Sequence, residues 1–282
     1  MQRAIEKVRV LMEALPYIKK FTGKNFVIKY GGSAMKQKKY KELFIQDIAL
    51  LSYVGINIII VHGGGDDINA LAKKLGKQAV FVDGHRVTDR ETLEIVEKVL
   101  VGKINKRIVK DLREHGLKVV GISGKDVDLI MAKKKLVNNK DIGFVGEVKK
   151  INTDILKTFE DSDVTPVIAP IGEDEKGNAY NINADAAAGK IAEALKADKL
   201  IYLTDTDGIK IKNKYVSSIK VKNVASYIKK GYITGGMLPK VDSAKSAVRA
   251  GVEKVHIING TAEHSLLLEI FTKEGIGTEI VK

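Results

Sequence analysis

The sequence predicts an α/β protein with an open, mainly parallel central sheet sandwiched between helices. Short aliphatic and β-branched runs alternate with longer stretches of helical periodicity, which is the order of elements in such folds. The runs are continuously apolar, as in parallel strands that helices cover on both faces. Ligands of such sheets bind where the strands end. We expect strands at 26–30, 58–61, 165–169, 200–203 and 255–258, with helices that include 40–54 and 67–75.

The first 21 residues precede these elements and predict a helix. Ile5, Val8, Met12 and Leu15 recur at helical spacing and give it one apolar face. Pro16 lacks a backbone N–H and should kink the helix or end it. Two interpretations remain open: the apolar face packs on the protein's own core, or the helix projects and docks on a neighbouring subunit.

Two segments depart from the alternation of strands and helices and predict β-hairpins. In the first, Asp83-Gly84 suits a tight type I′ turn between 79–82 and 85–88. Hairpins added to a parallel sheet often serve as lids or dimer surfaces. The second hairpin comprises 128–134 and 144–151, with Asn138-Asn139 between them.

Composition excludes several classes of protein. The 282 residues contain no cysteine, which excludes disulfides and thiolate chemistry, and we expect a cytoplasmic protein. No apolar run approaches the roughly 20 residues of a membrane span. The net charge of +13 would suit nucleic acid, but the lysines are scattered, are interleaved with acids and accompany no nucleic-acid-binding motif. We therefore expect neither nucleic acid nor membrane as a partner, and attribute the charge to solvation or to attraction of small anions.

The strongest local motif is IIIVHGGG at 58–65, where a predicted strand runs into three glycines and then a helix. Gly63, Gly64 and Gly65 let backbone N–H groups approach a ligand, and the following helix offers its positive end. A tight strand–helix turn explains one glycine but not three, so the motif indicates an anion site. The spacing fits neither a P-loop nor a dinucleotide-binding fingerprint.

Two lysines lie where a bound anion would explain them. Lys29, in IKYGG, ends a predicted strand beside a glycine turn, where a solvated side chain is the simpler alternative. Lys240, in GGMLPK, falls in the first turn of a predicted helix, where the helix dipole disfavours a cation.

The stretch YNINADAAAG at 180–189 adds one carboxylate and two amides. Asp185 begins a predicted helix and would either cap it or bind a polar ligand together with Asn181 and Asn183, and the residues alone leave this open. LTDTDG at 203–208 follows a strand at the edge where a ligand would lie. Lysines, a glycine nest and an aspartate suit phosphoryl transfer, which needs positioning and charge neutralisation.

Taken together, the ordered blocks of sequence resemble the acetylglutamate kinases of the amino acid kinase family over nearly the whole chain. The blocks are KYGGSAM, VHGGG, DGHRVTD, VLVGKINKRIV, GISGKD, DIGFVGEV, TPVIAPIG, YNINAD, LTDTDGI, GGMLPKV and LLLEIFTKEGIGT. The resemblance implies ATP-dependent phosphorylation of the γ-carboxylate of N-acetyl-L-glutamate in arginine biosynthesis. It implies ATP with Mg²⁺ brought by the nucleotide, and we expect no metal site made by the protein.

The resemblance also assigns site residues position by position. Lys29 and Lys240 would stabilise the transition state, and Asp185 would orient them. Substrate would be bound by Gly64, Gly65, Arg86, Asn181 and Asn183, with Arg86 on the hairpin lid. Nucleotide would be bound by Gly32, Gly63, Thr204, Asp205, Gly208, Gly236 and Met237. Asp66 departs from the family's pattern, in which proline is common at this position, and adds a negative charge near the phosphates.

The N-terminal helix resembles the extension of hexameric, arginine-inhibited members of the family. Inhibitory L-arginine would then be surrounded by Tyr17, His264, Glu269, Gly275 and Gly277. Alternatively, His264 and Glu269 merely face one another or solvent. We expect a homo-oligomer, a dimer that assembles into a hexamer. Its parts would be 1–21 for oligomerisation, 22–185 for acetylglutamate binding and dimerisation, and 186–282 for ATP binding and arginine sensing.

Two other functions remain as alternatives. A related kinase acts on aminoadipate linked to a carrier protein, but the YNINAD and GHRVTD stretches are typical of the acetylglutamate branch. An amino-acid-sensing or nucleic-acid-binding module without catalysis would have no physical reason to keep both Lys29 and Lys240.

Overall fold

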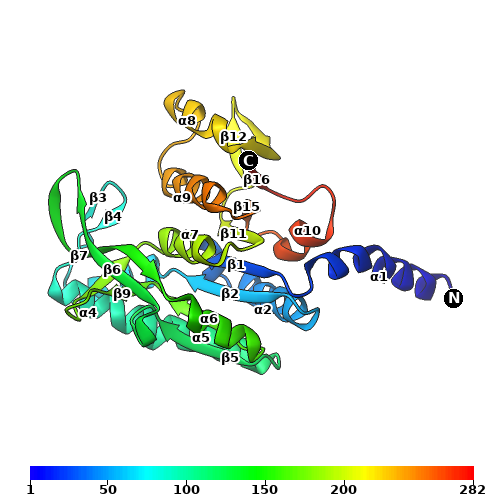
Figure 1. The fold of residues 1–282 in the computed structure, drawn as a ribbon, viewed down its shortest axis with the longest axis horizontal. Helices are drawn as coiled ribbons and strands as arrows, with labels where there is room; N and C mark the ends of the chain where they lie inside the picture. Colours follow the sequence, from blue (N-terminus) through cyan, green and yellow to red (C-terminus); the bar gives the residue numbers. More distant parts are fainter.

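The computed structural model describes the backbone of residues 1–282 and the side chains of all except Arg3, Ala4, Lys7 and Ser33. Its centre is one eight-stranded sheet (Figure 1). In spatial order the strands are β14 (Ser218–Lys220), β16 (Thr278–Val281), β15 (Lys254–Asn259), β11 (Lys199–Thr204), β1 (Asn25–Tyr30), β2 (Asn57–His62), β8 (Thr165–Ala169) and β5 (Val119–Ser123). The strands from β15 to β5 pair in parallel, whereas β16 runs antiparallel to β15. The predicted fold class is confirmed.

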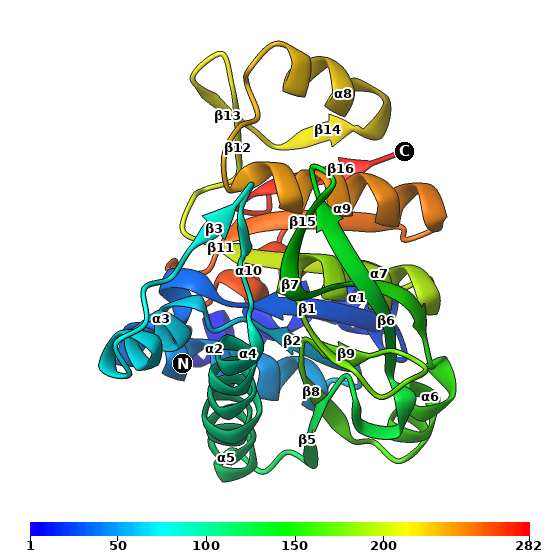
Figure 2. The same cartoon turned by 90° about the vertical axis from the view of Figure 1, so that its left-hand side faces the viewer.

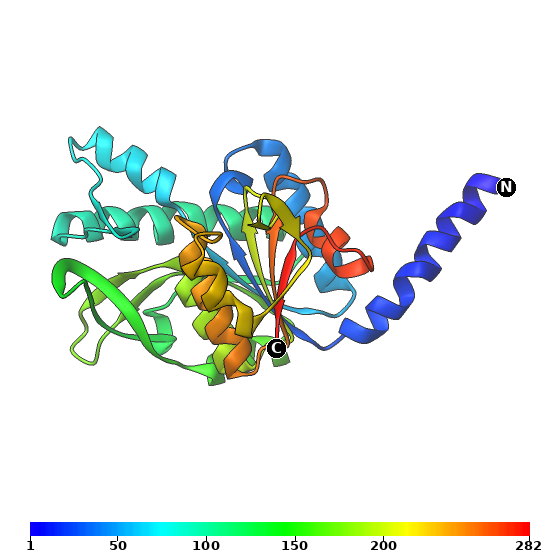
Figure 3. The same cartoon turned by 90° about the horizontal axis from the view of Figure 1, so that it is seen from above.

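Helices cover both faces of the sheet (Figures 1 and 3), which explains why its strands are apolar on both sides. Because side chains alternate along a strand, Phe26 and Ile28 join one buried cluster while Val27 joins the other. The first face carries α2 (Lys38–Tyr53), α5 (Lys106–Glu114) and α10 (Ser265–Phe271). The second face carries α6 (Thr153–Asp161), α7 (Ala184–Leu195), α8 (Val221–Lys229) and α9 (Met237–Ala250).

The connection between β2 and β5 contains most of the remaining helices. α3 (Gly65–Lys74) follows β2 directly, and the β3–β4 hairpin comes next. A long helix then has three parts, namely α4 (Arg90–Glu97), the π-helical segment η2 (Lys98–Asn105) and α5. Short 3₁₀ turns lie at η1 (Gly32–Met35) and η3 (Asp126–Asp128), and β12 (Ile209–Ile211) pairs with β13 (Lys214–Val216) beyond β11.

Both predicted hairpins are confirmed. β3 (Phe81–Val82) and β4 (His85–Arg86) pair around Asp83 and Gly84, whose φ angles of 46° and 77° suit a type I′ turn. β6 (Ile130–Val137) and β7 (Lys140–Ile151) form the second hairpin and close a small barrel with β9 (Ile171–Glu173) and β10 (Ala179–Ile182). The hairpins stand near one another in Figure 2, and a small apolar cluster and an Asn138–Asp83 hydrogen bond join them.

The N-terminal helix α1 (Gln2–Phe21) projects from the body of the molecule (Figures 1 and 3). Pro16 does not end it, because the helix continues to Phe21. Its last turns contact the body of the molecule: Tyr17 packs edge-on against Phe271, and Phe21 packs against Phe26. Its apolar face is exposed, with Met12 61% and Val8 58% accessible. The interpretation in which this face packs on the protein's own core is therefore wrong.

The central sheet continues through both predicted lobes, since β1 from one pairs with β11 from the other. The boundary predicted at residue 185 lies inside α7, and the division into lobes stays a prediction. Within the described chain no helix is both long and apolar enough to cross a bilayer.

Candidate active site

Three charged side chains from distant parts of the chain meet at the carboxyl edge of the sheet. Asp185, in the first turn of α7, lies between two lysines: its Oδ1 is 3.0 Å from the Nζ of Lys29, and its Oδ2 accepts a 2.9 Å hydrogen bond from the Nζ of Lys240. All three are largely shielded from solvent, with side-chain exposures of 11% for Lys29, 16% for Lys240 and 8% for Asp185. The simpler alternative for Lys29, a solvated strand tip, is wrong.

Pleating and packing explain how the lysines reach Asp185. Lys29 points to the same face of β1 as Val27, which is the face that α7 covers. A Cβ atom on Gly31 would come within 2.8 Å of the Nζ of Lys29, so the glycine leaves room for the lysine to fold back over the turn. Lys240 comes from the first turn of α9, which packs beside α7.

The electrostatics of the cluster favour an additional anion. Burial by itself would raise the pKa of the Asp185 carboxyl, but the charges and hydrogen bonds of Lys29 and Lys240 outweigh it and hold the pKa below its ordinary value. The carboxylate therefore stays ionised. One negative charge between two positive ones leaves a net charge of +1, which a transferring phosphoryl group would neutralise.

A cavity of about 180 Å³ opens beside this cluster and contains the predicted substrate residues. It is lined by Gly63, Gly64, Gly65, Arg86, Asn181 and Asn183, among others. Arg86 is 8% exposed, donates a 2.6 Å hydrogen bond to Asn69 Oδ1 and stacks 4.8 Å from the centre of the Phe81 ring. Burial lowers the pKa of its guanidinium. Asn181 donates to Thr88 Oγ1 over 3.3 Å.

The helix cap in YNINAD falls to Asn183 and not to Asp185. Asn183 Oδ1 accepts hydrogen bonds from the N–H groups of Asp185 (2.9 Å) and Ala186 (3.1 Å). Its oxygen is thus already used, and only its Nδ2 is left to donate to a ligand in the cavity. The capping alternative for Asp185 is wrong, because the helix begins at Ala184 and Asp185 is its second residue.

The predicted nucleotide residues are spread along the same edge. Thr204 ends β11, Gly236 caps α9, and Gly208 packs so closely against β16 that a Cβ atom would lie 2.5 Å from Thr278 Oγ1. Gly32 instead lines a neighbouring cavity of about 270 Å³. Neither cavity is lined by Thr204, Asp205, Gly208, Gly236 or Met237.

A separate cavity of about 400 Å³ lies where the base of α1 meets α10 and β15. Tyr17, Glu269, Gly275 and Gly277, four of the five residues that the resemblance assigns to an arginine site, line it. His264 does not, because its Nδ1 lies 2.6 Å from the buried Asp47. Hence His264 and Glu269 do not face one another either.

Sequence reasoning missed two residues that line this cavity, Lys199 and His256. His256 lies 2.5 Å from Glu269 Oε1 through its Nδ1 and 2.9 Å from the Nζ of Lys199 through its Nε2. Burial lowers the pKa of His256 and brings the pKa of Lys199 down to about 8. The available signal was a histidine within the apolar run of β15 and a lysine at the start of β11, next to its apolar run.

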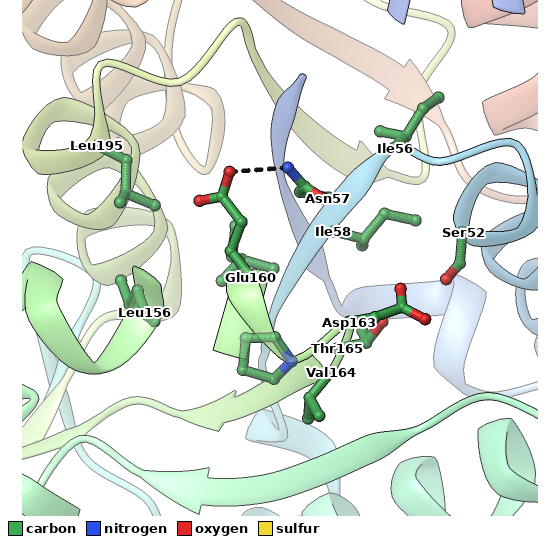
Figure 4. Close-up of a pocket in the computed structure, with 12 residues that line it drawn as sticks. Ser52, Ile56, Asn57, Ile58, Leu156, Glu160, Asp163, Val164, Thr165 and Leu195 are labelled. Atoms are coloured by element: carbon green, nitrogen blue, oxygen red, sulfur yellow. Dashed lines mark hydrogen bonds between the residues drawn. The ribbon is translucent and has the colours of Figure 1, made fainter. Parts of the chain in front are cut away.

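One further cavity is too small for these ligands. It is drawn in Figure 4 and lies at the opposite, amino edge of the sheet, where Asn57 donates to Glu160 over 2.9 Å. Its volume of about 20 Å³ has room for about one water molecule. Among the side chains that the structure describes, no three His, Cys, Asp or Glu residues group as ligands for a metal ion.

Comparison with known proteins identifies the family. Residues 24–259 match the model of the amino acid kinase family. The acetylglutamate kinase of Kosmotoga olearia is 54% identical over 98% of this chain and 97% of its own length.

Solved structures agree with this match. The N-acetylglutamate synthase of Neisseria gonorrhoeae, complexed with coenzyme A and N-acetyl-glutamate, superposes with a TM-score of 0.87 at 28% identity over 98% of this chain. The same synthase with coenzyme A and L-arginine gives 0.84 at 26% identity, again over 98% of this chain. This chain spans 63% and 65% of the length of those two structures. The chain therefore belongs to the amino acid kinase family, as a member of its acetylglutamate kinase branch.

Proposed function

We propose that this protein transfers the γ-phosphoryl group of ATP to the γ-carboxylate of N-acetyl-L-glutamate, a step of arginine biosynthesis. The observation that carries the proposal is the Lys29–Asp185–Lys240 cluster beside a 180 Å³ cavity lined by glycines, an arginine and asparagines. Full-length relatives with the same kinase description support it.

The reaction requires little covalent chemistry from the protein itself. A glutamate-type carboxylate has a pKa of about 4.3, so near neutral pH it attacks without a general base. Arg86 would bind the substrate's α-carboxylate from the hairpin, and the glycine turns would offer N–H groups to the phosphates. Lys29 and Lys240 would neutralise charge on the transferring group, held in place by Asp185. Mg²⁺ would enter with ATP as part of the substrate.

The test is ADP release from MgATP with N-acetyl-L-glutamate, using L-glutamate and L-aspartate as control acids. Turnover with the acetylated acid alone is the expected result. Equal turnover with free glutamate would contradict the substrate assignment. Absence of turnover with all three acids would contradict the proposed reaction and direct attention to a carrier-linked acid.

We further propose that L-arginine inhibits the enzyme by binding the 400 Å³ cavity at the base of α1. This cavity offers Glu269 to a guanidinium and Lys199 to a carboxylate, and Tyr17 ties it to the N-terminal helix. The related synthase solved with L-arginine supports the choice of ligand. Addition of arginine to the turnover assay should reduce the rate, and an unchanged rate would remove this regulation.

We also propose that α1 joins subunits into a hexamer built from dimers, because its projecting apolar face is otherwise left in water. Met12→Asp places a charge on that face and should yield smaller species in sedimentation or light scattering. Glu13→Gln is the matched control on the same helix. A hexamer that survives Met12→Asp unchanged would contradict the proposal.

A further inference from the structure

A buried histidine lies directly beneath the glycine turn and has no part in the chemistry described so far. His62 is the last residue of β2, is fully buried and precedes Gly63. Its Nδ1 lies 3.0 Å from the carbonyl oxygen of Gly63, and its Nε2 lies 3.3 Å from Nδ2 of Asn105, which is also fully buried. Both imidazole nitrogens are therefore engaged.

These contacts determine the protonation state of the imidazole. A carbonyl oxygen can only accept, so Nδ1 carries the hydrogen and donates it to Gly63. Asn105 Nδ2 also donates to the carbonyl of Val167 over 2.8 Å, which identifies it as the amide nitrogen. Nε2 of His62 is then the acceptor, and the imidazole is neutral. Burial lowers the pKa of His62 to about 4, in agreement with this state.

The surroundings of Asn105 leave just enough space for its contact with His62. The residue ends the π-helical segment η2, and such wide turns often lie at functional sites. Its Oδ1 is buried without a hydrogen-bond partner among the described atoms. A Cβ atom on Gly121 would lie 2.1 Å from that oxygen, so a glycine is needed in β5 to make room.

Three hydrogen bonds hold the glycine turn at Gly63 and Gly64. Tyr30 O accepts from Gly63 N–H (2.8 Å), Gly64 O accepts from Ile68 N–H (3.0 Å), and Gly63 O accepts from His62. Gly64 N–H has no acceptor within the described part of the chain, and Gly64 lines the substrate cavity. In a trans peptide the N–H points opposite to the preceding carbonyl. Anchoring Gly63 O on the imidazole therefore directs Gly64 N–H away from the core.

We propose that His62 and Asn105 are positioning residues for phosphoryl transfer: they lock the Gly63–Gly64 peptide so that Gly64 N–H is presented to the reacting anion. Asn105 fixes the tautomer of the imidazole, and the imidazole fixes the peptide. Neither side chain touches substrate. The inference rests on the proposed function for the identity of the anion, but the orientation of the peptide is independent of it.

Two isosteric amides separate positioning from simple packing. His62→Asn places an amide nitrogen where Nδ1 lies and preserves the donor to Gly63. His62→Gln places its amide near Nε2 and preserves the partner of Asn105, but leaves Gly63 O without a donor. We expect kcat to fall on the order of 10- to 100-fold in His62→Gln, with a smaller change in KM, as when one preorganised donor is lost. His62→Asn should retain most of kcat.

Thermal unfolding of both variants provides the structural control. Equal kcat in the two variants, or losses of kcat that follow the losses in melting temperature, would overturn the proposal. The tautomer can be measured without any variant, by NMR of the wild-type protein labelled with ¹⁵N-histidine. A signal of the Nδ1–H form for His62 at pH 7 is expected, and the Nε2–H form would overturn the proposal. Wild-type protein without kinase activity would contradict the proposed function and leave this tautomer result in force.

Discussion

Two buried clusters of lysine and carboxylate lie on the same sheet and are built differently. At the carboxyl edge, Lys29 and Lys240 share the single carboxylate of Asp185, at 3.0 and 2.9 Å. Near α10, Lys199 is separated from Glu269 by His256, which contacts both. The first cluster carries a net charge of +1. The second is neutral as long as Lys199 is charged, Glu269 is ionised and His256 is not protonated.

The difference shows that the ratio of carboxylates to lysines and the extent of burial together decide the charge of a cluster. In the first, paired cations hold the pKa of Asp185 down against the effect of burial. In the second, burial prevails and the pKa of Lys199 falls to about 8. A surplus positive charge suits a transferring phosphoryl group, whereas a balanced set suits a ligand that carries both signs, such as an amino acid.

The largest expected effect is on the first cluster. Lys240→Ala should lower kcat on the order of 10²- to 10³-fold, because it removes a charge that acts mainly in the transition state. The KM for N-acetyl-L-glutamate should change much less. Lys245→Ala is the matched control, since this lysine lies on the same helix and pairs with Asp242. Equal kcat for both variants in steady-state kinetics would contradict the role of Lys240 in phosphoryl transfer.

The second prediction concerns Lys199 and the pH dependence of the free energy of unfolding. The pKa of Lys199 is about 8 in the folded protein and near 10.5 in the unfolded chain, so the unfolded chain binds more protons between these values. The contribution of Lys199 to the free energy of unfolding therefore increases as pH rises from 8 to 10.5, by roughly 3 kcal/mol in total. Lys199→Met should remove this contribution.

Urea unfolding at pH 7 and at pH 10 measures the effect. The free energy of unfolding should fall less, or rise more, between these pH values in wild type than in Lys199→Met. Identical pH dependence in the two proteins would show that Lys199 is not held in the environment described.

The third prediction concerns the regulatory cavity and rests on the arginine proposal. Glu269→Gln should raise the arginine concentration for half-inhibition by about 10-fold or more, since a hydrogen bond to a charged group is lost. His264→Asn should leave it unchanged, because His264 contacts Asp47 outside the cavity. Loss of inhibition in His264→Asn alone would reverse the two assignments.

The smallest effect is expected at an exposed ion pair beside the glycine turns. Asp66 lies 3.0 Å from Lys36, with side-chain exposures of 64% and 59%. Such pairs contribute about 0–1 kcal/mol, so Asp66→Asn should change the free energy of unfolding by less than about 1 kcal/mol. Since Lys36 already balances Asp66, the KM for ATP should change little. A large change in that KM would show that the Asp66 charge acts on the phosphates.

Local patterns predicted much of the fold and part of the site. The apolar runs located β1, β2, β8, β11 and β15, because burial on both faces leaves a continuous apolar signature. An Asp-Gly pair and an Asn-Asn pair located the two hairpin turns, where φ is positive. Lys240 was identified because the helix dipole disfavours a cation in the first turn of a helix, and Lys29 because it ends a strand beside a glycine turn.

Prediction from sequence failed where only the folded structure decides between two candidate residues. Asp185 and Asn183 are both good capping residues within three positions of each other, and only the actual start of α7 decides between them. His264 lies closer to Glu269 in sequence than His256 does. The pairing of β15 with β11 nevertheless places His256 beside Lys199 and, with α10 packed against the sheet, beside Glu269.

By itself, the sequence determined the strands, the turns and the kinds of chemical group at the carboxyl edge, since these follow from periodicity and backbone preference. Tertiary structure alone decided which groups touch. Lys29 and Lys240 share the carboxylate of Asp185 because β1, α7 and α9 converge there. His62 reaches Asn105 because a π-helical turn and Gly121 make room. The physical reason is that hydrogen bonds and ion pairs act over about 3 Å, a scale that only packing of distant segments sets.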